Sequence, residues 1–400
     1  MKLALAFVAC AALAAAQTFT SRGFLESDTT LYPQVAPNDS SHAVSEMLLR
    51  YEASWQALPW LKFSGAFDAR TDTHRQVERV WSLDWNDRAL QRPDFSLRRF
   101  SALVNKGNWT FEAGRQFIRW GKADILNPTD RFAPKDFLNV VNTDFLGVVA
   151  ARATYERGSN TIDLIWQPYF TPSRTPLLNQ RWTVLPAALN NIPIHDLGAR
   201  YPGRSQFGGR WNHIARGYEY SASYFDGFNY LPLFEPSLNV SRYYPRLRLV
   251  GADAAIPTRW FTLKAEAAYY MSPKKQSDEY LLYVLQLERT VKEWVFVTGY
   301  AGEVVTASTA NPFQFSPERG FARSILGRAG YTISPTKSFA ITGTTRQNGQ
   351  GTWLRFEYSQ TYARHWRATG GVTWIHGNPG DFLGQYHLNS YASLALRYSF

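Results

Sequence analysis

Residues 114–137 gather side chains that could bind a charged or amphipathic solute. The candidate binding side chains are Arg119, Trp120, Lys122, Asp124, Asn127, Asp130, Arg131 and Lys135. Alternating cations and carboxylates can pair with a charged wall or line a pore, and aromatic rings among them favour burial. The run Asn127-Pro128-Thr129-Asp130 is a turn signal, because proline fixes φ and Asn and Asp close side-chain turns. We expect residues 118–144 to fold inward and form the narrowest point of a pore. A surface loop shielding a rim is the alternative.

The other residues that could do chemistry favour no reaction. His195 and Asp196 could belong to a catalytic pair, but no G-x-S-x-G nucleophile context accompanies them, so a turn is the better interpretation. None of the seven histidines has the spacing of a metal site. Phosphate-binding loops, dinucleotide fingerprints and calcium loops are absent from the sequence. The sequence therefore predicts a protein that is not an enzyme and uses no metal and no cofactor.

The last ten residues indicate the kind of element that positions these side chains. In an extended strand one face carries Ala392, Leu394, Leu396, Tyr398 and Phe400, and the other carries Ser393, Arg397 and Ser399. The first face suits lipid and the second suits water. This alternation is typical of a transmembrane β-strand.

The start of the chain and its composition support export to a membrane. Lys2, an apolar run and Ala14-Ala15-Ala16 form a secretory signal peptide at residues 1–16, which leaves 17–400 as the mature chain. Aromatic residues make up 16% of the chain although the mean hydropathy is −0.32, a pairing that membrane barrels explain. A net charge of +11 would suggest nucleic acid in a cytosolic protein. Export removes that partner and favours anionic solutes and lipopolysaccharide phosphates.

Period-2 segments along the chain predict a series of antiparallel hairpins. Short turns are expected near residues 57–59, 106–107, 158–159, 214–215, 257–258, 291–292, 335–336 and 362–363, and mostly longer polar connections lie between them. Short periplasmic turns alternating with long extracellular loops are typical of outer-membrane barrels. With a weak first strand at 19–31, we predict an all-β transmembrane barrel of eighteen strands, with sixteen as the alternative. The faces of the strands around 243–256 and 292–305 alternate ambiguously. A soluble sandwich or propeller is the rival fold.

Charged residues on the inward faces predict a water-filled lumen, because charge is costly toward lipid. The basic positions are Arg50, Lys62, Arg70, Arg99, Arg152, Arg210, Lys264, Arg328, Arg346, Arg355, Arg367 and Arg397. The acidic positions are Glu52, Asp68, Glu112, Glu156, Asp163, Glu219, Glu266, Glu288 and Glu357. Pairing between neighbouring strands is the structural alternative for any one of them. The small basic excess predicts a weak preference for anions.

Two stretches resemble known proteins. The alternating strand that ends at Phe400 resembles the closing strand of Gram-negative outer-membrane β-barrels, which implies that Tyr398 and Phe400 serve as a signal for the barrel-assembly machinery. Residues 114–130 resemble a poorly characterised family of outer-membrane proteins with a G-R-Q, W-G-[KE], acidic and N-P-x-D pattern. The matching positions are Gly114, Arg115, Gln116, Trp120, Gly121, Lys122, Asp124, Asn127, Pro128 and Asp130. The hairpin with Trp166 and Pro168 is also similar. The resemblance implies a role in transport or in another process of the cell envelope.

These features together predict a passive, porin-like channel of the bacterial outer membrane. It would pass small, anionic or amphipathic solutes and contact outer-membrane lipid and lipopolysaccharide. Two other classes remain open: a hydrolase with its site at the barrel rim, and a structural or adhesion barrel with a plugged lumen.

Overall fold

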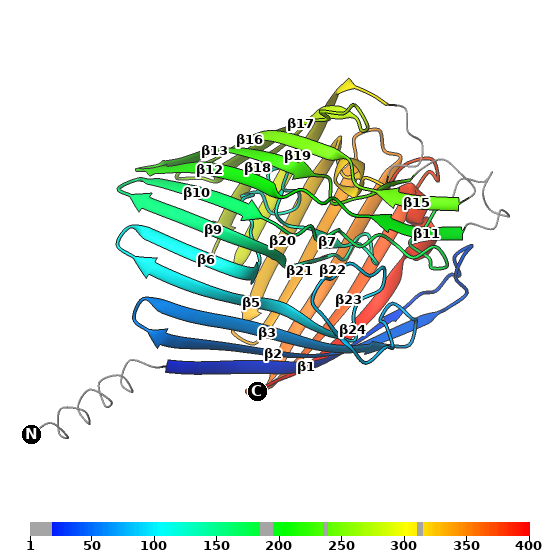
Figure 1. The fold of residues 1–400 in the computed structure, drawn as a ribbon. Coiled ribbons are helices and arrows are strands. Elements are labelled where there is room, and N and C mark those ends of the chain that lie inside the picture. The colour runs from blue at the N-terminus through cyan, green and yellow to red at the C-terminus, as the bar shows by residue number, and fades with distance from the viewer. Residues whose placement is uncertain (1–17, 185–194, 235–238, 310–314) are drawn as a thin grey trace, which may run out of the picture.

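Eighteen long antiparallel strands close on themselves to form a barrel wall (Figure 1). The structure, a computed structural model, describes residues 18–184, 195–234, 239–309 and 315–400. The predicted signal peptide at 1–16 lies outside the described residues. The wall strands are β1 (Thr18–Leu31), β2 (Ala43–Leu58), β3 (Leu61–Asp72), β5 (Phe95–Lys106), β6 (Trp109–Gln116), β9 (Val148–Arg157), β10 (Asn160–Gln167), β12 (Gln206–Ala215), β13 (Tyr218–Phe228), β16 (Arg246–Pro257), β17 (Thr262–Met271), β18 (Glu279–Val291), β19 (Trp294–Ala307), β20 (Ser324–Ser334), β21 (Lys337–Arg346), β22 (Gly351–Tyr362), β23 (Trp366–Gly377) and β24 (Tyr391–Ser399).

The barrel closes where its first and last strands pair. Phe24 lies opposite Ser399, and the antiparallel register runs from there to Leu31 opposite Ala392. Phe400 and Gly23 extend it by exchanging two backbone hydrogen bonds of 2.9 Å. The predicted count of eighteen strands is confirmed, including the weak first strand, and the alternative of sixteen is wrong.

Short and long connections lie at opposite ends of the barrel. All eight predicted short turns are confirmed, and they share one end of the barrel with the start of β1 and with the C-terminus (Figure 1). The other end carries nine connections, numbered here in chain order as the first to ninth loops: residues 32–42, 73–94, 117–147, 168–205, 229–245, 272–278, 308–323, 347–350 and 378–390. They hold the short elements β4 (Leu83–Asp84), β7 (Lys135–Asp136), β8 (Asp144–Phe145), β11 (His195–Arg200), β14 (Leu233–Phe234), β15 (Asn239–Tyr243), α2 (Pro317–Gly320) and η2 (Gly384–Asn389).

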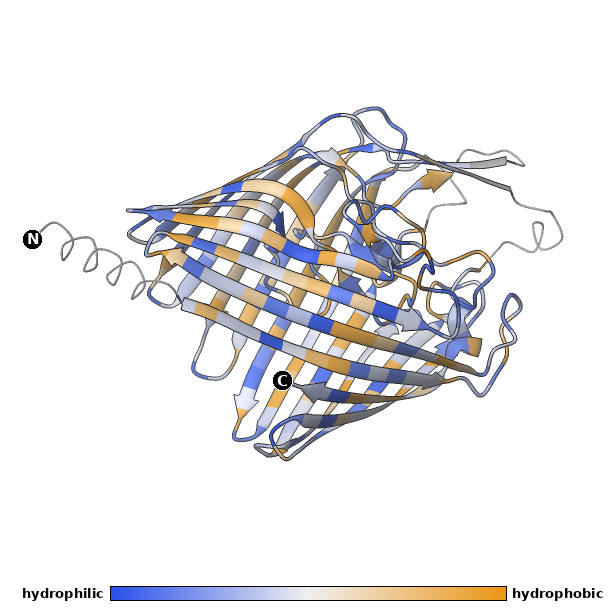
Figure 2. Ribbon diagram, turned by 60° about the horizontal axis from the view of Figure 1, so that its bottom comes forward, coloured by the Kyte–Doolittle hydropathy of each residue, from blue (hydrophilic) through white to orange (hydrophobic). Residues whose placement is uncertain are grey.

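The outer face of the wall is apolar and exposed. Leu394, Leu396 and Phe400 are 51%, 45% and 53% exposed, whereas their neighbours Ser393 and Arg397 point inward and are half-buried. Polar and apolar residues alternate along the strands in the same way elsewhere in the wall (Figure 2). The predicted facing of the last strand is confirmed. Among the described residues, no helix has the length and apolar character needed to span a membrane.

Strand β16 explains why its faces could not be assigned from the sequence. Leu247 and Leu249 are buried on the inner face, whereas Arg248 shares the outer face with the exposed Val250. Apolar side chains can face inward here because the third loop lies against them inside the barrel. The usual rule of apolar outside and polar inside is therefore reversed at this end of the strand.

Candidate functional site

The third loop folds into the barrel and packs against its inner wall. Its apolar residues Ile118, Trp120 and Phe132 are each at most 2% exposed and share one cluster with inward side chains of the wall, including Phe225 and Leu249. Phe132 meets the ring of Phe225 edge to face, with 5.2 Å between the ring centres. Burying each large apolar side chain contributes about 1.5–3 kcal/mol. The loop is thereby held as part of the core.

A single carboxylate anchors the backbone of this loop. Glu266 on β17 accepts hydrogen bonds from the backbone N–H groups of Lys122 (3.0 Å), Ala123 (3.1 Å) and Thr129 (2.8 Å), and from the Thr129 hydroxyl (2.9 Å). Glu266 is 2% exposed. Hydrogen bonds to an ionised group are worth about 1.5–3 kcal/mol each. This inward glutamate is therefore a support for the loop.

Charged side chains of the loop are also paired with the wall. The Lys122 ammonium lies 2.9 Å from Glu219 and 2.9 Å from Asp253, and its side chain is 15% exposed. Asp124 receives the ammonium of Lys264 at 3.0 Å. The sequence proposed Lys122 and Asp124 as solute contacts, and the structure places both in ion pairs that fasten the loop.

The Asn-Pro-Thr-Asp turn shapes the loop from within. Asp130 accepts hydrogen bonds from the backbone N–H groups of Trp120 (2.6 Å) and Gly121 (2.7 Å) and pairs with Arg119 at 3.1 Å. Asn127 donates from its side chain to the carbonyl of Ala123. Of the loop's cations, Arg119 keeps a side chain that is 46% exposed. It is the most exposed of the loop's four cations, since the side chains of Lys122, Arg131 and Lys135 are 15%, 6% and 15% exposed.

The second half of the loop crosses to the opposite side of the lumen. Arg131 and Lys135 lie 3.3 Å and 3.7 Å from Glu318 of α2 in the seventh loop. Further on, Asn142 accepts a hydrogen bond of 3.0 Å from Arg355 on β22. The loop thus contacts the wall on two sides and divides the upper lumen.

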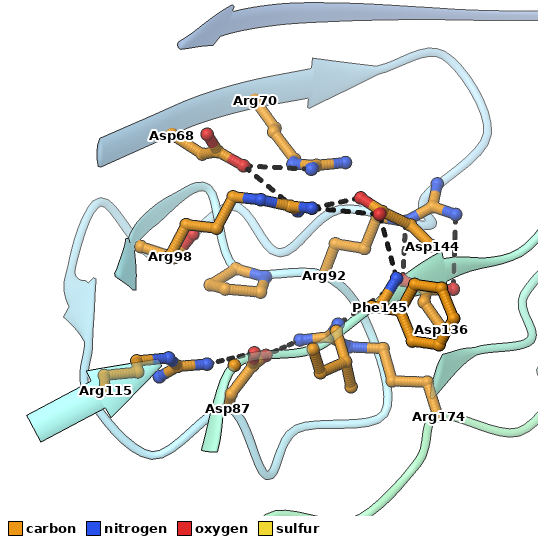
Figure 3. A pocket seen from close by; sticks show the side chains of 14 residues that line it. Asp68, Arg70, Asp87, Arg92, Arg98, Arg115, Asp136, Asp144, Phe145 and Arg174 are labelled. Atoms are coloured by element: carbon orange, nitrogen blue, oxygen red, sulfur yellow. Dashed lines mark hydrogen bonds and ion pairs between the residues drawn. The ribbon is translucent and has the colours of Figure 1, made fainter. Parts of the chain in front are cut away.

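A cluster of five arginines and four aspartates fixes the second, third and fourth loops to the wall (Figure 3). It surrounds a small cavity of about 50 Å³, and its charged members are Asp68, Arg70, Asp87, Arg92, Arg98, Arg115, Asp136, Asp144 and Arg174. Arg98 holds Asp144 through two hydrogen bonds of 2.7 and 2.9 Å. Burial disfavours the charged form of Asp144, but the hydrogen bonds and charge of Arg98 outweigh it and lower the pKa of Asp144.

The fourth loop crosses the mouth of the barrel above this cluster. Arg174 is buried against Asp87 and Asp136 on one side. On the far side Arg181 lies 3.6 Å from the ring centre of Tyr32, and the ring of Trp182 packs against η2. Residues 168–184 therefore form a strap over the opening. His195 and Asp196, interpreted from the sequence as turn residues in preference to a catalytic pair, lie in strand β11, so the turn interpretation is wrong; only the backbone pairing of these two residues is described.

An arginine-rich face of the lumen remains outside the third loop. The inward ring of Phe24 lies between the guanidinium groups of Arg397 and Arg50, at 4.1 Å and 5.4 Å from its centre. Arg397 also pairs with Glu26 at 2.6 Å, and Arg50 pairs with Asp68 at 2.7 Å. This face can offer cations and an aromatic surface together.

The remaining charged positions predicted from the sequence all lie on inner faces of wall strands, in two groups. Most are paired: Glu52 with Arg22, Arg70 with Glu46 and Asp68, Arg99 with Glu112, Arg152 with Asp163, Arg210 with Asp253, Lys264 with Glu288, Arg346 with Asp381 and Arg355 with Glu357. Arg367 donates to the hydroxyl of Ser359. Lys62, Glu156 and Arg328 form no ion pair with another described residue.

Sequence reasoning missed the side chains that complete the supports. Phe24 stands in a strand with weak alternation, Tyr270 donates a hydrogen bond of 2.7 Å to the Pro128 carbonyl, and Glu318 lies in a distant loop. Nothing in the local sequence indicates these roles, since Tyr270 and Glu318 are 142 and 187 positions away from Pro128 and Arg131, the loop residues they hold. Gly208 carried a weak signal: a Cβ there would lie 2.5 Å from the Phe132 ring, so only glycine admits the loop so closely.

The closed eighteen-strand barrel is similar in fold to several solved bacterial proteins, one of which is described as the outer membrane protein OpdK of Pseudomonas aeruginosa (9% identity, TM-score 0.52, covering 96% of this chain and 99% of the other). Solved structures with this fold include OccAB4 of Acinetobacter baumannii (10% identity, TM-score 0.57) and OpdQ of Pseudomonas aeruginosa (11%, 0.53), each covering 96% of this chain and 98% of the other. OpdK of Pseudomonas aeruginosa, solved with vanillate, is also similar (9%, 0.50, covering 95% and 98%). No family model and no curated protein matches the chain.

Proposed function

We propose that this protein resides in the bacterial outer membrane and acts as a porin-like channel for small anionic or amphipathic solutes. The proposal rests on one observation: Glu266 and apolar side chains of the inner wall hold the third loop inside a closed barrel whose lumen is lined by charged residues. A loop that crosses the lumen narrows it and places chosen side chains in the path, which is how channels select solutes. Diffusion through such a pore needs no cofactor.

The path we propose runs between the third loop and the wall of β22–β24, β1 and β2. Half-buried charged side chains collect there, among them Arg355, Glu357 and Arg397, together with the ring of Phe24. On the loop side Arg119 and Asp144 are 46% and 49% exposed at their side chains. Cations beside an aromatic ring suit a solute that joins a carboxylate to an apolar body.

Planar bilayers test the channel and its narrowing together. Wild-type protein should conduct ions, and removal of residues 122–135 should raise the single-channel conductance. Glu266→Ala should release the same loop without shortening it and should add current fluctuations. Glu112→Ala, which removes a wall carboxylate that contacts Arg99 and Ser101 of β5, is the matched control and should behave as wild type. Equal conductance in all four proteins would contradict the constriction.

Charge neutralisation tests the path. Arg50→Gln with Arg397→Gln should lower the anion-to-cation permeability ratio by about twofold, because two cations leave the wall of the pore. Lys337→Gln with Arg364→Gln removes the same charge from exposed positions at two of the short turns and should leave the ratio unchanged. Vanillate, which OpdK was solved with, is a suitable aromatic carboxylate for competition against ion current.

The two other classes give different outcomes. A barrel that inserts but conducts nothing, even after the loop deletion, would be structural and plugged. Hydrolysis of lipids or peptides that disappears in His195→Ala would identify a rim enzyme instead.

A further inference from the structure

Three arginines surround one aspartate on the outer surface of the barrel, at the end that carries the loops. Arg204, Arg246 and Arg248 approach the carboxylate of Asp226 at 3.2, 3.0 and 3.2 Å. The Asp226 side chain is 13% exposed, while those of Arg204 and Arg248 are 46% and 42% exposed. One carboxylate neutralises one of three guanidinium groups, so the cluster keeps an excess of positive charge.

The facing of the strands puts this cluster outside the lumen. Arg248 lies directly opposite Asp226 across β13 and β16, and shares its face with Val250, which is 53% exposed. Tyr224, on the same face as Asp226, is 45% exposed. The alternate residues Leu247 and Leu249 point inward against the third loop. A solute inside the pore therefore cannot reach these arginines.

A groove of about 340 Å³ adjoins the cluster. It is lined by two of the arginines, three aromatic rings and two residues of the sixth loop: Arg204, Phe228, Tyr243, Tyr244, Arg246, Lys274 and Gln276. Lys274 is exposed and forms no ion pair with another described residue. Counting Arg204, Arg246, Arg248 and Lys274 against Asp226 gives a local charge of +3.

We propose that this outer-rim basic groove binds a phosphate group of lipopolysaccharide, the anionic glycolipid of the outer leaflet. Guanidinium forks match phosphate oxygens in geometry and charge, and Lys274 can add a point charge from above. The exposed Val250 and Tyr224 continue from the cluster along the outer wall and can contact acyl chains, which favours a lipid phosphate over a free ion. An arginine on the lipid side of a barrel costs little folding free energy only when it lies near the lipid headgroups. The phosphate groups of lipopolysaccharide lie at the same level. The inference rests on the proposed outer-membrane location.

Native mass spectrometry of the full-length protein in detergent tests the groove, with bis-phosphorylated lipid A as the probe. Arg246→Gln with Arg248→Gln should weaken binding about tenfold or more, because two cations that face the phosphate are lost. Lys274→Gln leaves the Asp226 pairs intact and should weaken it about threefold. The matched control, Lys337→Gln with Arg364→Gln, removes equal charge at the short turns and should bind as wild type.

Several outcomes decide the proposal. Lipid A binding by the folded double variant that equals wild type would overturn it, and so would displacement of lipid A by inorganic phosphate at equal concentration. If the double variant does not fold, unchanged binding by Lys274→Gln overturns it instead. Bilayer conductance separates the two proposals, since the arginine variant should conduct normally. A wild-type protein that binds lipid A but does not conduct would refute the channel and leave the groove standing.

Discussion

Phe400 closes the barrel by filling a space that Gly23 leaves open. A Cβ at Gly23 would lie 2.6 Å from the Phe400 ring, so the ring covers the bare backbone of the neighbouring strand. Two backbone hydrogen bonds of 2.9 Å join the same residues. Covering a strand glycine with an aromatic ring stabilises strand pairing. The terminal aromatic thus has a packing role at the seam in addition to the assembly role that its resemblance implies.

We expect Phe400→Ser to lower the yield of assembled barrel. The substitution removes the ring from Gly23 and from its neighbour Tyr398, a loss of about 1 kcal/mol at the seam. The fraction of heat-modifiable, folded protein in cell envelopes measures the effect. Phe296→Ser, which removes an outward ring of similar exposure (43% against 53%) from β19, away from the seam, serves as control. Equal losses in the two variants would show that the seam has no special role.

Single residues also mark the limit of what could be predicted. Arg119, Lys122 and Asp130 could be named as members of a charged loop because they lie close together in sequence. Their partners could not: Glu266 follows Lys122 by 144 positions, and Glu318 follows Arg131 by 187. A one-dimensional pattern shows which side chains need partners, and only the closed barrel shows which partners they meet.

At the scale of the strand, alternation was a sufficient guide wherever one face meets lipid and the other meets water. Strand β24 obeys this rule, so its facing and the strand count could be predicted. Strand β16 does not, because the third loop covers Leu247 and Leu249 from inside and the arginines stand outside at the rim. The ambiguous alternation of β16 therefore has two structural causes: the third loop packs against its inner face, and the outer-rim basic groove adjoins its outer face.

The two faces of β24 predict opposite tolerance to charge. Leu394→Arg places a cation on the lipid face and should cost about 2–4 kcal/mol of folding free energy if the site lies near the bilayer midplane. Ser393→Arg faces the lumen, where water can solvate the charge, and should cost far less. Urea unfolding in liposomes compares the two, with wild type as reference. Equal destabilisation would mean that the outward and inward faces have been exchanged.

At the scale of the molecule, a rigid wall supports a strap of loops that is fastened at both ends. The fourth loop is held at the far side by Asp39, which accepts hydrogen bonds from the backbone N–H groups of Ser41 (2.9 Å) and Arg181 (3.3 Å) and pairs with His74 at 2.7 Å. Burial raises the pKa of Asp39, but these hydrogen bonds and the neighbouring charges outweigh it, so the pKa is lowered overall. A lowered pKa means that this fastening is complete above the ordinary aspartate value of 3.8 and is lost as the pH falls through the lowered value.

Releasing this fastening should open the strap while the barrel stays intact. In the wild type Arg181 is 4% exposed, so trypsin cannot cleave after it. Asp39→Ala removes charged hydrogen bonds worth about 1.5–3 kcal/mol each, which raises the open population of the strap about tenfold or more. We expect trypsin at pH 7 to cleave Asp39→Ala after Arg181 at least about tenfold faster than wild type. Asp39→Asn keeps the shape but not the charge, and it should imitate the acid state with an intermediate rate. Heat modifiability should be unchanged in both, because none of these contacts belongs to the wall. Faster cleavage accompanied by loss of the folded band would show that the strap and the barrel do not unfold separately. A wild-type cleavage rate in Asp39→Ala would show that the carboxylate is not needed, and that the Arg181 guanidinium stacked 3.6 Å from the ring centre of Tyr32 holds the strap by itself.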